Sequence, residues 1–273
     1  MEPAWDRQAL LASPLLHTVR PFIEALPADR FPDCDALNEL ARRHALRNAN
    51  GRPIRFVPPE GEAKIAACDY EGRAYRTGEV LTRERNWHDF YNALAWLAFP
   101  RTKASINALH IAELERQSGS VRSVARDVLT LFDEGGMIVA CSRPALIELL
   151  RDFKWKELFV AQREAVRVHM RFYVVGHAVH EKALAPYRGI IAHAIFAAVD
   201  EGFHVLAPEA QLAAMDAAAA AQLRTSPMLR DTSTLQPLPI LGIPRWWPQN
   251  ESPTYYDDTG HFRPGRTRRV AAK

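Results

Sequence analysis

One segment, Trp87–Phe99, constrains the fold more than any other part of the sequence, because as a helix it is apolar on nearly every side. A helix that is apolar all round is stable only where other elements cover it, so this segment is expected to be deeply buried. Pro100 cannot continue the helix and is expected to end it. A second helix is expected to begin near Thr102.

The chain is long enough to bury such a helix. It has 273 residues, of which 48% are hydrophobic and 25% charged, and these are the proportions of an ordinary globular protein. At this length a folded chain buries roughly 75% of the surface that its unfolded form exposes, so stability needs no disulfide or metal. We therefore expect residues 1–273 to form a single globular domain.

The spacing of apolar residues predicts an α+β fold that is mainly helical, with a small antiparallel β-sheet. The glycines of Asp133–Gly136 indicate the turn of a hairpin. Helices are expected at Asp35–Asn48, Trp87–Phe99, Thr102–Gln117, Pro144–Phe153, Gly176–Leu184, Tyr187–Val199 and Pro208–Leu223. Strands are expected at Ile54–Val57, Tyr70–Tyr75, Glu79–Leu81, Val128–Phe132, Met137–Cys141 and Val166–Val175.

The last part of the chain differs in composition from the rest. Prolines are concentrated there, but tryptophan, tyrosine and branched aliphatic residues lie between them, whereas a free linker would be polar. Residues 225–262 are therefore expected to form an extended arm, rich in proline and tryptophan, that packs on the domain. Residues 264–273 are expected to form a loose basic tail.

Two sets of polar side chains interrupt the apolar helix and the helix that follows it. Residues three or four apart share one face of a helix, so each set is expected to line a single face. If the two helices fold back on each other, both sets meet in one cluster. Buried groups without partners cost ~1–3 kcal/mol each, so these groups are expected to bond to each other, to water or to a ligand. The first set is His88, Asp89 and Asn92, and the second is Lys103, Asn107 and His110.

Two interpretations of this cluster are open. In the structural one, Asp89 caps the first helix, while Asn92 and Asn107 brace neighbouring backbone. In the functional one, a histidine acts as base, and an anionic ligand binds to Arg101, Lys103 and Asn107. The candidate catalytic residues in that case are His88, Asp89, Asn92 and His110.

A second group of titratable residues lies further along the chain. His177 and Glu181 are four residues apart at a junction between a strand and a helix, and His193 follows on the next element. Imidazole and carboxylate are ligands of divalent metals, so these three residues are the candidate metal ligands. The spacing differs from the H-E-x-x-H pattern of metalloproteases, so it names no reaction. A divalent metal is the one cofactor that the sequence suggests.

Charge and motifs narrow the function classes. The formal charge of +3 is distributed in small groups of Lys and Arg, which is typical of solvated surface. This pattern disfavours a nucleic-acid partner without excluding one, and the partner that the cluster suggests is a small anionic ligand. No phosphate-binding P-loop, dinucleotide-binding fingerprint or nucleophile elbow is present, which disfavours ATPases, Rossmann oxidoreductases and typical α/β-hydrolases.

The cysteines and the apolar stretches bear on location. Cys34, Cys68 and Cys141 are far apart and form no C-x-x-C pair, so neither a disulfide framework nor a cysteine zinc site is expected. The first residues lack the pattern of a signal peptide, and no apolar stretch approaches the ~20 residues that span a bilayer. We expect a cytoplasmic protein without a membrane contact. Its protein partner cannot be named from the sequence.

Several motifs together resemble a bacterial family known only as a domain of unknown function, number 3025. The resemblance covers most of the chain and implies a stand-alone bacterial protein, but it implies no activity and no catalytic residues. The motifs are Thr82-Arg83, the run from Trp87 to Lys103, Leu129–Glu134, Gly176-His177 with Glu181, Asn250-Glu251, Tyr256–Asp258 and Phe262–Pro264.

The sequence leaves open whether the chain is an enzyme. The leading hypothesis is a ligand-binding protein or a hydrolase that acts on a phosphate-bearing substrate, because the cluster holds acid–base and anion-stabilising groups. The alternative is a non-catalytic interaction protein whose arm presents Trp246 and Trp247 to a partner.

Overall fold

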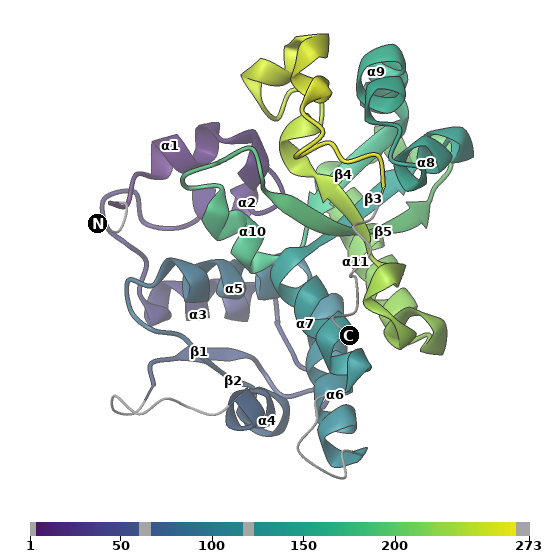
Figure 1. The fold of residues 1–273 in the computed structure, drawn as a ribbon. Helices are drawn as coiled ribbons and strands as arrows, with labels where there is room; N and C mark the ends of the chain where they lie inside the picture. The colour runs from purple at the N-terminus through teal and green to yellow at the C-terminus, as the bar shows by residue number, and fades with distance from the viewer. Residues whose placement is uncertain (1–3, 60–66, 117–122, 266–273) are drawn as a thin grey trace.

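The computed structural model describes residues 4–59, 67–116 and 123–265, and Figure 1 shows how their elements are arranged. The helices are α1 (Arg7–Ala12), α2 (Arg20–Glu24), α3 (Cys34–Arg43), α4 (Ala67–Thr77), α5 (Trp87–Ala98), α6 (Pro100–Arg116), α7 (Val124–Gly135), α8 (Pro144–Arg151), α9 (Arg163–His169), α10 (His177–Lys182) and α11 (Pro208–Leu223). The strands are β1 (Arg55–Val57), β2 (Glu79–Leu81), β3 (Gly136–Cys141), β4 (Met170–Val174), β5 (Ile191–Ala198) and β6 (Gln236–Pro239). The predicted α+β, mainly helical class is confirmed.

The larger sheet has the strand order β4-β3-β5-β6 and is mixed. Strand β3 pairs with β4 in antiparallel and with β5 in parallel orientation, and β5 pairs with β6 in antiparallel orientation. A separate two-stranded sheet joins β1 and β2 in parallel. The prediction of a purely antiparallel sheet was therefore wrong, because β3 and β5 are linked through β4 and α10 and not by a hairpin turn.

Three predicted elements have a different secondary structure, and a fourth, the predicted strand Val166–Val175, belongs to α9 up to His169 and is a strand only from Met170. Val128–Phe132 lies in α7, where the buried Val128, Leu129 and Phe132 follow a helical spacing and not an alternating one. Tyr70–Tyr75 lies in α4, which packs on α6. Tyr187–Val199 contains β5 and not a helix, because pairing with two neighbouring strands outweighs the helix propensity of its alanines.

Helix α5 is covered on nearly all sides, as its composition predicts. Its residues from Phe90 to Ala98 are all buried, and its first turn packs on the N-terminal segment through Trp87, whose ring stacks 5.9 Å from that of Trp5. Helix α10 packs against α5, and α3 and α6 also contact it. In Figure 1 α3 lies beside α5 and α10 lies above it.

The arm, residues 225–262, joins the larger sheet. Its strand β6 pairs with β5, and its apolar side chains are buried where the arm continues past the sheet. Asn250 Nδ2 donates to the carbonyl oxygens of Leu241 and Ile243, both at 2.8 Å, and Tyr256 Oη donates to that of Gly242 at 2.7 Å. Of the predicted loose tail, residues 266–273 lie outside the described residues.

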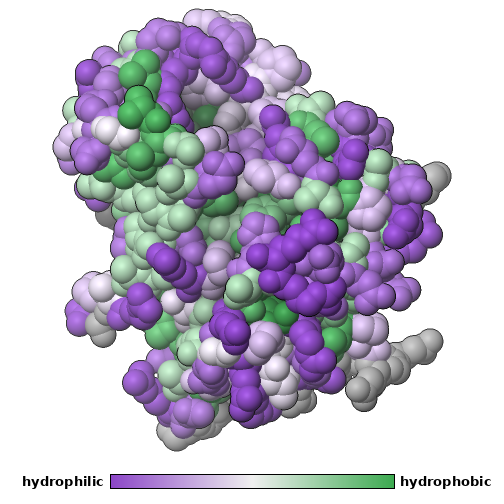
Figure 2. All heavy atoms as spheres, turned by 180° about the vertical axis from the view of Figure 1, so that it is seen from behind, coloured by the Kyte–Doolittle hydropathy of each residue, from purple (hydrophilic) through white to green (hydrophobic). Residues whose placement is uncertain are grey.

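The outer surface is mainly hydrophilic on the face that Figure 2 shows, with apolar residues in separate patches between polar ones. Within the described ranges, no helix combines the length and the apolar character needed to cross a membrane.

A buried carboxylate fixes the junction between α5 and α6. Asp216 of α11 accepts hydrogen bonds from the first backbone N–H groups of α6, at 3.0 Å from Arg101 N and 2.8 Å from Thr102 N. The first N–H groups of a helix have no partner within the helix, so this side chain satisfies two of them. It thereby anchors α6 on α11, and Lys103 and Asn107 follow within the next two turns.

We predict that Asp216→Ala lowers the free energy of unfolding by about 1–3 kcal/mol, because two buried N–H groups lose their acceptor. Urea unfolding followed by circular dichroism measures the change. Glu209→Ala is the control, since Glu209 is exposed on the same helix and its replacement is expected to change stability by less than about 0.5 kcal/mol. Equal effects of the two substitutions would contradict this role of Asp216.

Candidate functional site

His88 lies in the first turn of α5, where the chain leaves the surface and enters the core. Asn86 caps this helix by accepting a hydrogen bond from Asp89 N at 3.0 Å. His88 Nδ1 lies 2.9 Å from Glu181 Oε2, and His88 Nε2 lies 3.0 Å from His177 Nε2. The side chains of His88 and Glu181 are 37% and 42% exposed, whereas that of His177 is 7% exposed. The three residues therefore lead from solvent into the interior.

The contacts continue beyond His177 into the core. Its Nδ1 lies 3.7 Å from Asp133 Oδ2, and Asp133 forms an ion pair with the buried Lys103. Lys103 Nζ also donates to Asn92 Oδ1 at 2.8 Å, and Asn92 Nδ2 donates to Tyr70 Oη at 2.6 Å. We name this series the polar chain: Glu181, His88, His177, Asp133, Lys103, Asn92 and Tyr70.

Five helices, α4, α5, α6, α7 and α10, meet to form the polar chain, and one close approach sets its geometry. A Cβ atom on Gly176 would lie 2.4 Å from the carbonyl oxygen of Glu134, so only glycine lets the start of α10 come this near the end of α7. The approach places His177 beside Asp133. Lys103 comes from α6 and Asn92 from α5, which completes the cluster.

A buried carboxyl lies next to the polar chain. Asn107 Nδ2 donates to Glu71 Oε2 at 2.6 Å and to the backbone oxygen of Glu71 at 3.0 Å. Burial raises the pKa of Glu71 to about 7. Asn107 Oδ1 is buried and has no hydrogen-bond partner. Glu71 is thus a carboxyl that binds or releases a proton near neutral pH, at the inner end of the site.

The charges of the inner residues follow from their surroundings. Burial lowers the pKa of His177 to about 3, so its imidazole is neutral near pH 7. Burial is the largest single effect on Asp133 and raises its pKa, but the charge and hydrogen bond of Lys103, together with His177 and His110, outweigh it and leave that pKa below its usual value. Asp133 and Lys103 therefore form a buried pair of opposite charges beside a neutral imidazole.

The contact between the two imidazoles restricts the positions of their protons. Only one of the two Nε2 atoms carries a proton, because one must donate and the other accept. If His88 carries protons on both nitrogens, it donates to Glu181 and His177, and the proton of His177 sits on Nδ1, facing Asp133. If His88 carries one proton, on Nδ1, then His177 donates from Nε2. In that case Nδ1 of His177, which faces Asp133, carries no proton. A proton gained or lost at His88 thus changes the tautomer of His177.

The structure brings some of the candidate catalytic and ligand-binding residues together and not others. His88, Asn92 and Lys103 belong to the polar chain, and Asn107 lies beside it. His110 is buried, and its charge acts on Asp133. Asp89 instead faces Arg83, whose Nε and Nη2 donate to its two carboxylate oxygens at 2.8 and 2.9 Å.

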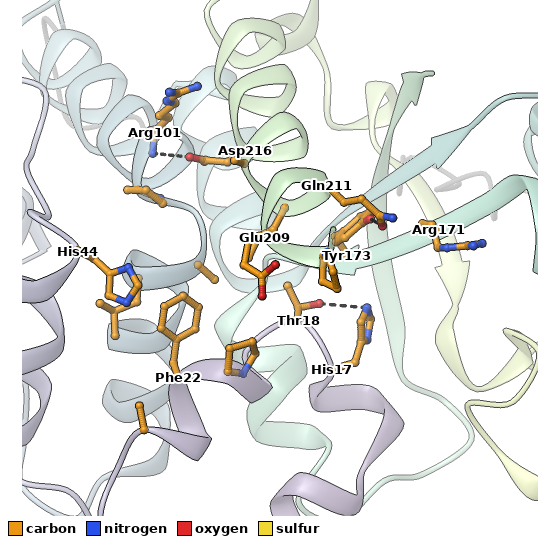
Figure 3. Close-up of a pocket in the computed structure, with 18 residues that line it drawn as sticks. His17, Thr18, Phe22, His44, Arg101, Arg171, Tyr173, Glu209, Gln211 and Asp216 are labelled. Atoms are coloured by element: carbon orange, nitrogen blue, oxygen red, sulfur yellow. Dashed lines mark hydrogen bonds between the residues drawn. The ribbon is translucent and has the colours of Figure 1, made fainter. Parts of the chain in front are cut away.

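Arg101 lies outside the cluster. Figure 3 shows its backbone nitrogen bonded to Asp216 and its guanidinium extending away from a pocket of about 550 Å³. That pocket is separate from the polar chain and is lined mainly by apolar surface, to which Phe22 contributes, and His44 and Tyr173 also line it. The geometry does not place Arg101 where it would bind a ligand together with Lys103.

The three candidate metal ligands are not assembled. Glu181 and His177 both contact His88, but His193 lies on β5 and lines another cavity. In the part of the chain that the structure describes, no group of three or more His, Cys, Asp or Glu side chains is arranged to hold a metal ion.

Sequence reasoning missed Tyr70, Glu71 and Asp133. Tyr70 and Glu71 fell in a segment expected to be a strand, and Asp133 in an expected turn. The helical spacing of Val128, Leu129 and Phe132 is the signal that would have extended α7 to Asp133. No local pattern indicates that Tyr70 and Glu71 reach Asn92 and Asn107, because these contacts join distant segments.

We predict that Lys103→Met lowers the free energy of unfolding by about 3–5 kcal/mol, because Asp133 is left as a buried charge without its partner. Adding Asp133→Leu should recover most of this loss. The control is Lys154→Met, which removes an exposed ion pair at 3.6 Å and is expected to change stability by less than about 1 kcal/mol. Chemical denaturation measures all three, and equal losses in both single variants would contradict the prediction.

His180 supports a second prediction, on pH. Burial lowers the pKa of His180 to about 3, and neither of its ring nitrogens has a hydrogen-bond partner. As the pH falls, the unfolded chain binds the additional proton first, near the ordinary pKa of about 6.5, so stability is complete above that pH and is lost as the pH falls toward 3. Between pH 7 and pH 5 the wild type should lose roughly 2 kcal/mol more than His180→Leu. Urea unfolding at both pH values measures this, and parallel losses would contradict it.

The chain was compared with known proteins. Searches of curated proteins and of solved structures each found no match. One family model matches residues 54–266, a range that includes every member of the polar chain. The chain therefore belongs to the family described as "Protein of unknown function (DUF3025)".

Proposed function

We propose that this protein is a hydrolase that acts on a phosphate-bearing substrate at the exposed end of the polar chain. The observation that carries the proposal is the pair of contacts at His88, 2.9 Å to Glu181 Oε2 and 3.0 Å to His177 Nε2. A partly exposed carboxylate held by an imidazole is an acid–base group that can exchange protons with a bound substrate. The buried residues behind it keep this group in one position.

The roles within the site follow from which atoms are already engaged. Both ring nitrogens of His88 have partners, whereas Glu181 accepts from His88 through Oε2 only. Glu181 therefore serves as the general base toward an attacking water, through Oε1. His88 is a positioning residue, because its hydrogen bond holds the carboxylate of Glu181 in place. His177 is neutral and adapts its tautomer to the protonation state of His88.

Arg83 is the group that we assign to the anion. Its side chain is 59% exposed while it holds Asp89, and its pKa is raised mainly by Asp89 and to a smaller extent by the charge of Glu181. A guanidinium beside a general base suits a phosphoryl group, because arginine pairs with phosphate oxygens in a fork geometry. Lys103 is less suited to this role, since Asp133 and Asn92 already engage it.

The arm supports the alternative function less well. Trp246, the first of its two tryptophans, packs its ring at 5.4 Å from that of His17 and 6.2 Å from that of Phe172. Trp246 and Trp247 are both partly buried. These contacts favour a role for Trp246 in holding the arm on the domain.

We predict that Glu181→Gln lowers kcat/KM at least 100-fold toward p-nitrophenyl phosphate or bis(p-nitrophenyl) phosphate, because a general base contributes about 10²–10⁴-fold. His88→Asn should lower kcat/KM and change the pH profile of kcat. The matched control is Glu201→Gln, since the exposed Glu201 has its Oε2 3.0 Å from His169 Nδ1 in another imidazole–carboxylate pair.

Release of p-nitrophenol by the full chain, with and without Mg²⁺, measures these effects. Thermal unfolding of each variant verifies that the fold is kept. Equal losses in Glu181→Gln and Glu201→Gln, or no turnover of either ester by the wild type, would refute the proposal.

A further inference from the structure

A cavity of about 720 Å³ lies between the sheet and the end of the chain, away from the polar chain. Its floor is formed by the edge of the larger sheet. In the register of β5 and β6, Ile191 pairs with Pro239 and His193 with Pro237, and all four residues line the cavity. Directly paired residues point to the same face of a sheet, so these side chains form one surface.

The strand burial pattern explains why this surface is open. Ala192 and Ala194 of β5 are fully buried on the opposite face, whereas Ile191 and His193 are only partly buried. The segments that lie over Ile191 and His193 belong to the arm and to the loop after α8. They enclose the cavity without filling it.

Two aromatic rings form one wall of the cavity. Phe153 and Trp155 follow α8, and their rings contact edge to face at 5.7 Å. Trp155 Nε1 donates to the backbone oxygen of Arg263 at 2.7 Å, which ties this wall to the segment after the arm. Phe153 has a φ of 59°, in the left-handed region that a bulky residue adopts only when its surroundings hold it there. The wall is thus a fixed feature of the fold.

The groups around the cavity include one guanidinium and several hydrogen-bond donors. Arg263, His193 and His261 line it together with the hydroxyl residues Thr232 and Ser233, and no carboxylate is found among the described residues of its lining. His261 Nδ1 is bonded to Asp258 Oδ2 at 3.0 Å, so Nε2 is the ring nitrogen that remains for a ligand.

We propose that this cavity binds a small planar aromatic anion. The rings of Phe153 and Trp155 offer apolar contacts for an aromatic ring, Arg263 offers positive charge for an anionic group, and the two imidazoles offer polar ring nitrogens. The volume falls in the range of about 300–1,000 Å³ that is usual for small-molecule sites. The site is independent of the polar chain, so it would hold a second molecule or an effector of the protein.

Isothermal titration of the full chain at pH 7 tests this proposal with three probes. The probes are 1-naphthalenesulfonate, which has the ring and the charge, 1-naphthalenemethanol, which has the ring alone, and inorganic sulfate, which has the charge alone. We expect the sulfonate to bind at least tenfold more tightly than either of the others. Equal affinity for the sulfonate and the alcohol, or no binding of the sulfonate, overturns the proposal.

Variants assign the binding to this cavity. Ser233→Asp adds a negative charge at an exposed position of the lining, so the fold is retained and the sulfonate affinity should fall at least tenfold. Arg263→Gln should lower that affinity at least fivefold. Arg42→Gln, on the exposed face of α3, is the control and should leave it unchanged. Unchanged affinity in Ser233→Asp places the probe elsewhere and overturns the proposal.

Discussion

The buried ion pair between Lys103 and Asp133 is the interaction on which the arrangement of the central helices depends. Removing two charges from water is unfavourable, and the attraction between them compensates only when further hydrogen bonds complete the geometry. Asn92 and His177 supply these additional contacts, from α5 and α10. The pair therefore has one satisfactory arrangement, with α5, α6, α7 and α10 each in a fixed place. Such a pair contributes to a unique packing more than to net stability.

This arrangement separates the site into two parts with different properties. In the inner part Lys103 pairs with Asp133, and His177 is neutral at pH 7. Glu71, beside this part, is the carboxyl that gains or loses a proton near pH 7. The outer part consists of Glu181 and His88, whose side chains are partly exposed to solvent. Burial of the inner part thus gives the outer pair a rigid support, while the outer pair is the part that reaches solvent. An enzyme gains from such rigidity because the reacting group needs no reorganisation.

The sequence predicted the central feature of the site and not its extent. The all-apolar character of α5 and the spacing of Asn92, Lys103 and Asn107 were enough to expect buried polar groups in one place, since helical spacing is a local property. The sequence did not predict that Asp133 belongs to the site, because two glycines suggested a hairpin turn where α7 ends. It did not predict Tyr70 and Glu71 either, because their contacts join α4 to α5 and α6, which are distant in the sequence. Strand β5 was mistaken for a helix, since alanine favours helix locally and only pairing with β3 and β6 overrides that preference.

The order of the strands in the larger sheet has a consequence for how the chain folds as it is made. Strand β5 lies between β3 and β6, but β6 follows it only after the whole of α11 and the first part of the arm. Until then, one edge of β5 presents unpaired backbone groups next to apolar side chains, which is a template for pairing with another chain. The arm removes this template when it docks. In a chain that lacks the arm, β5 is an open edge strand that can pair with another chain, so the arm protects the sheet against aggregation.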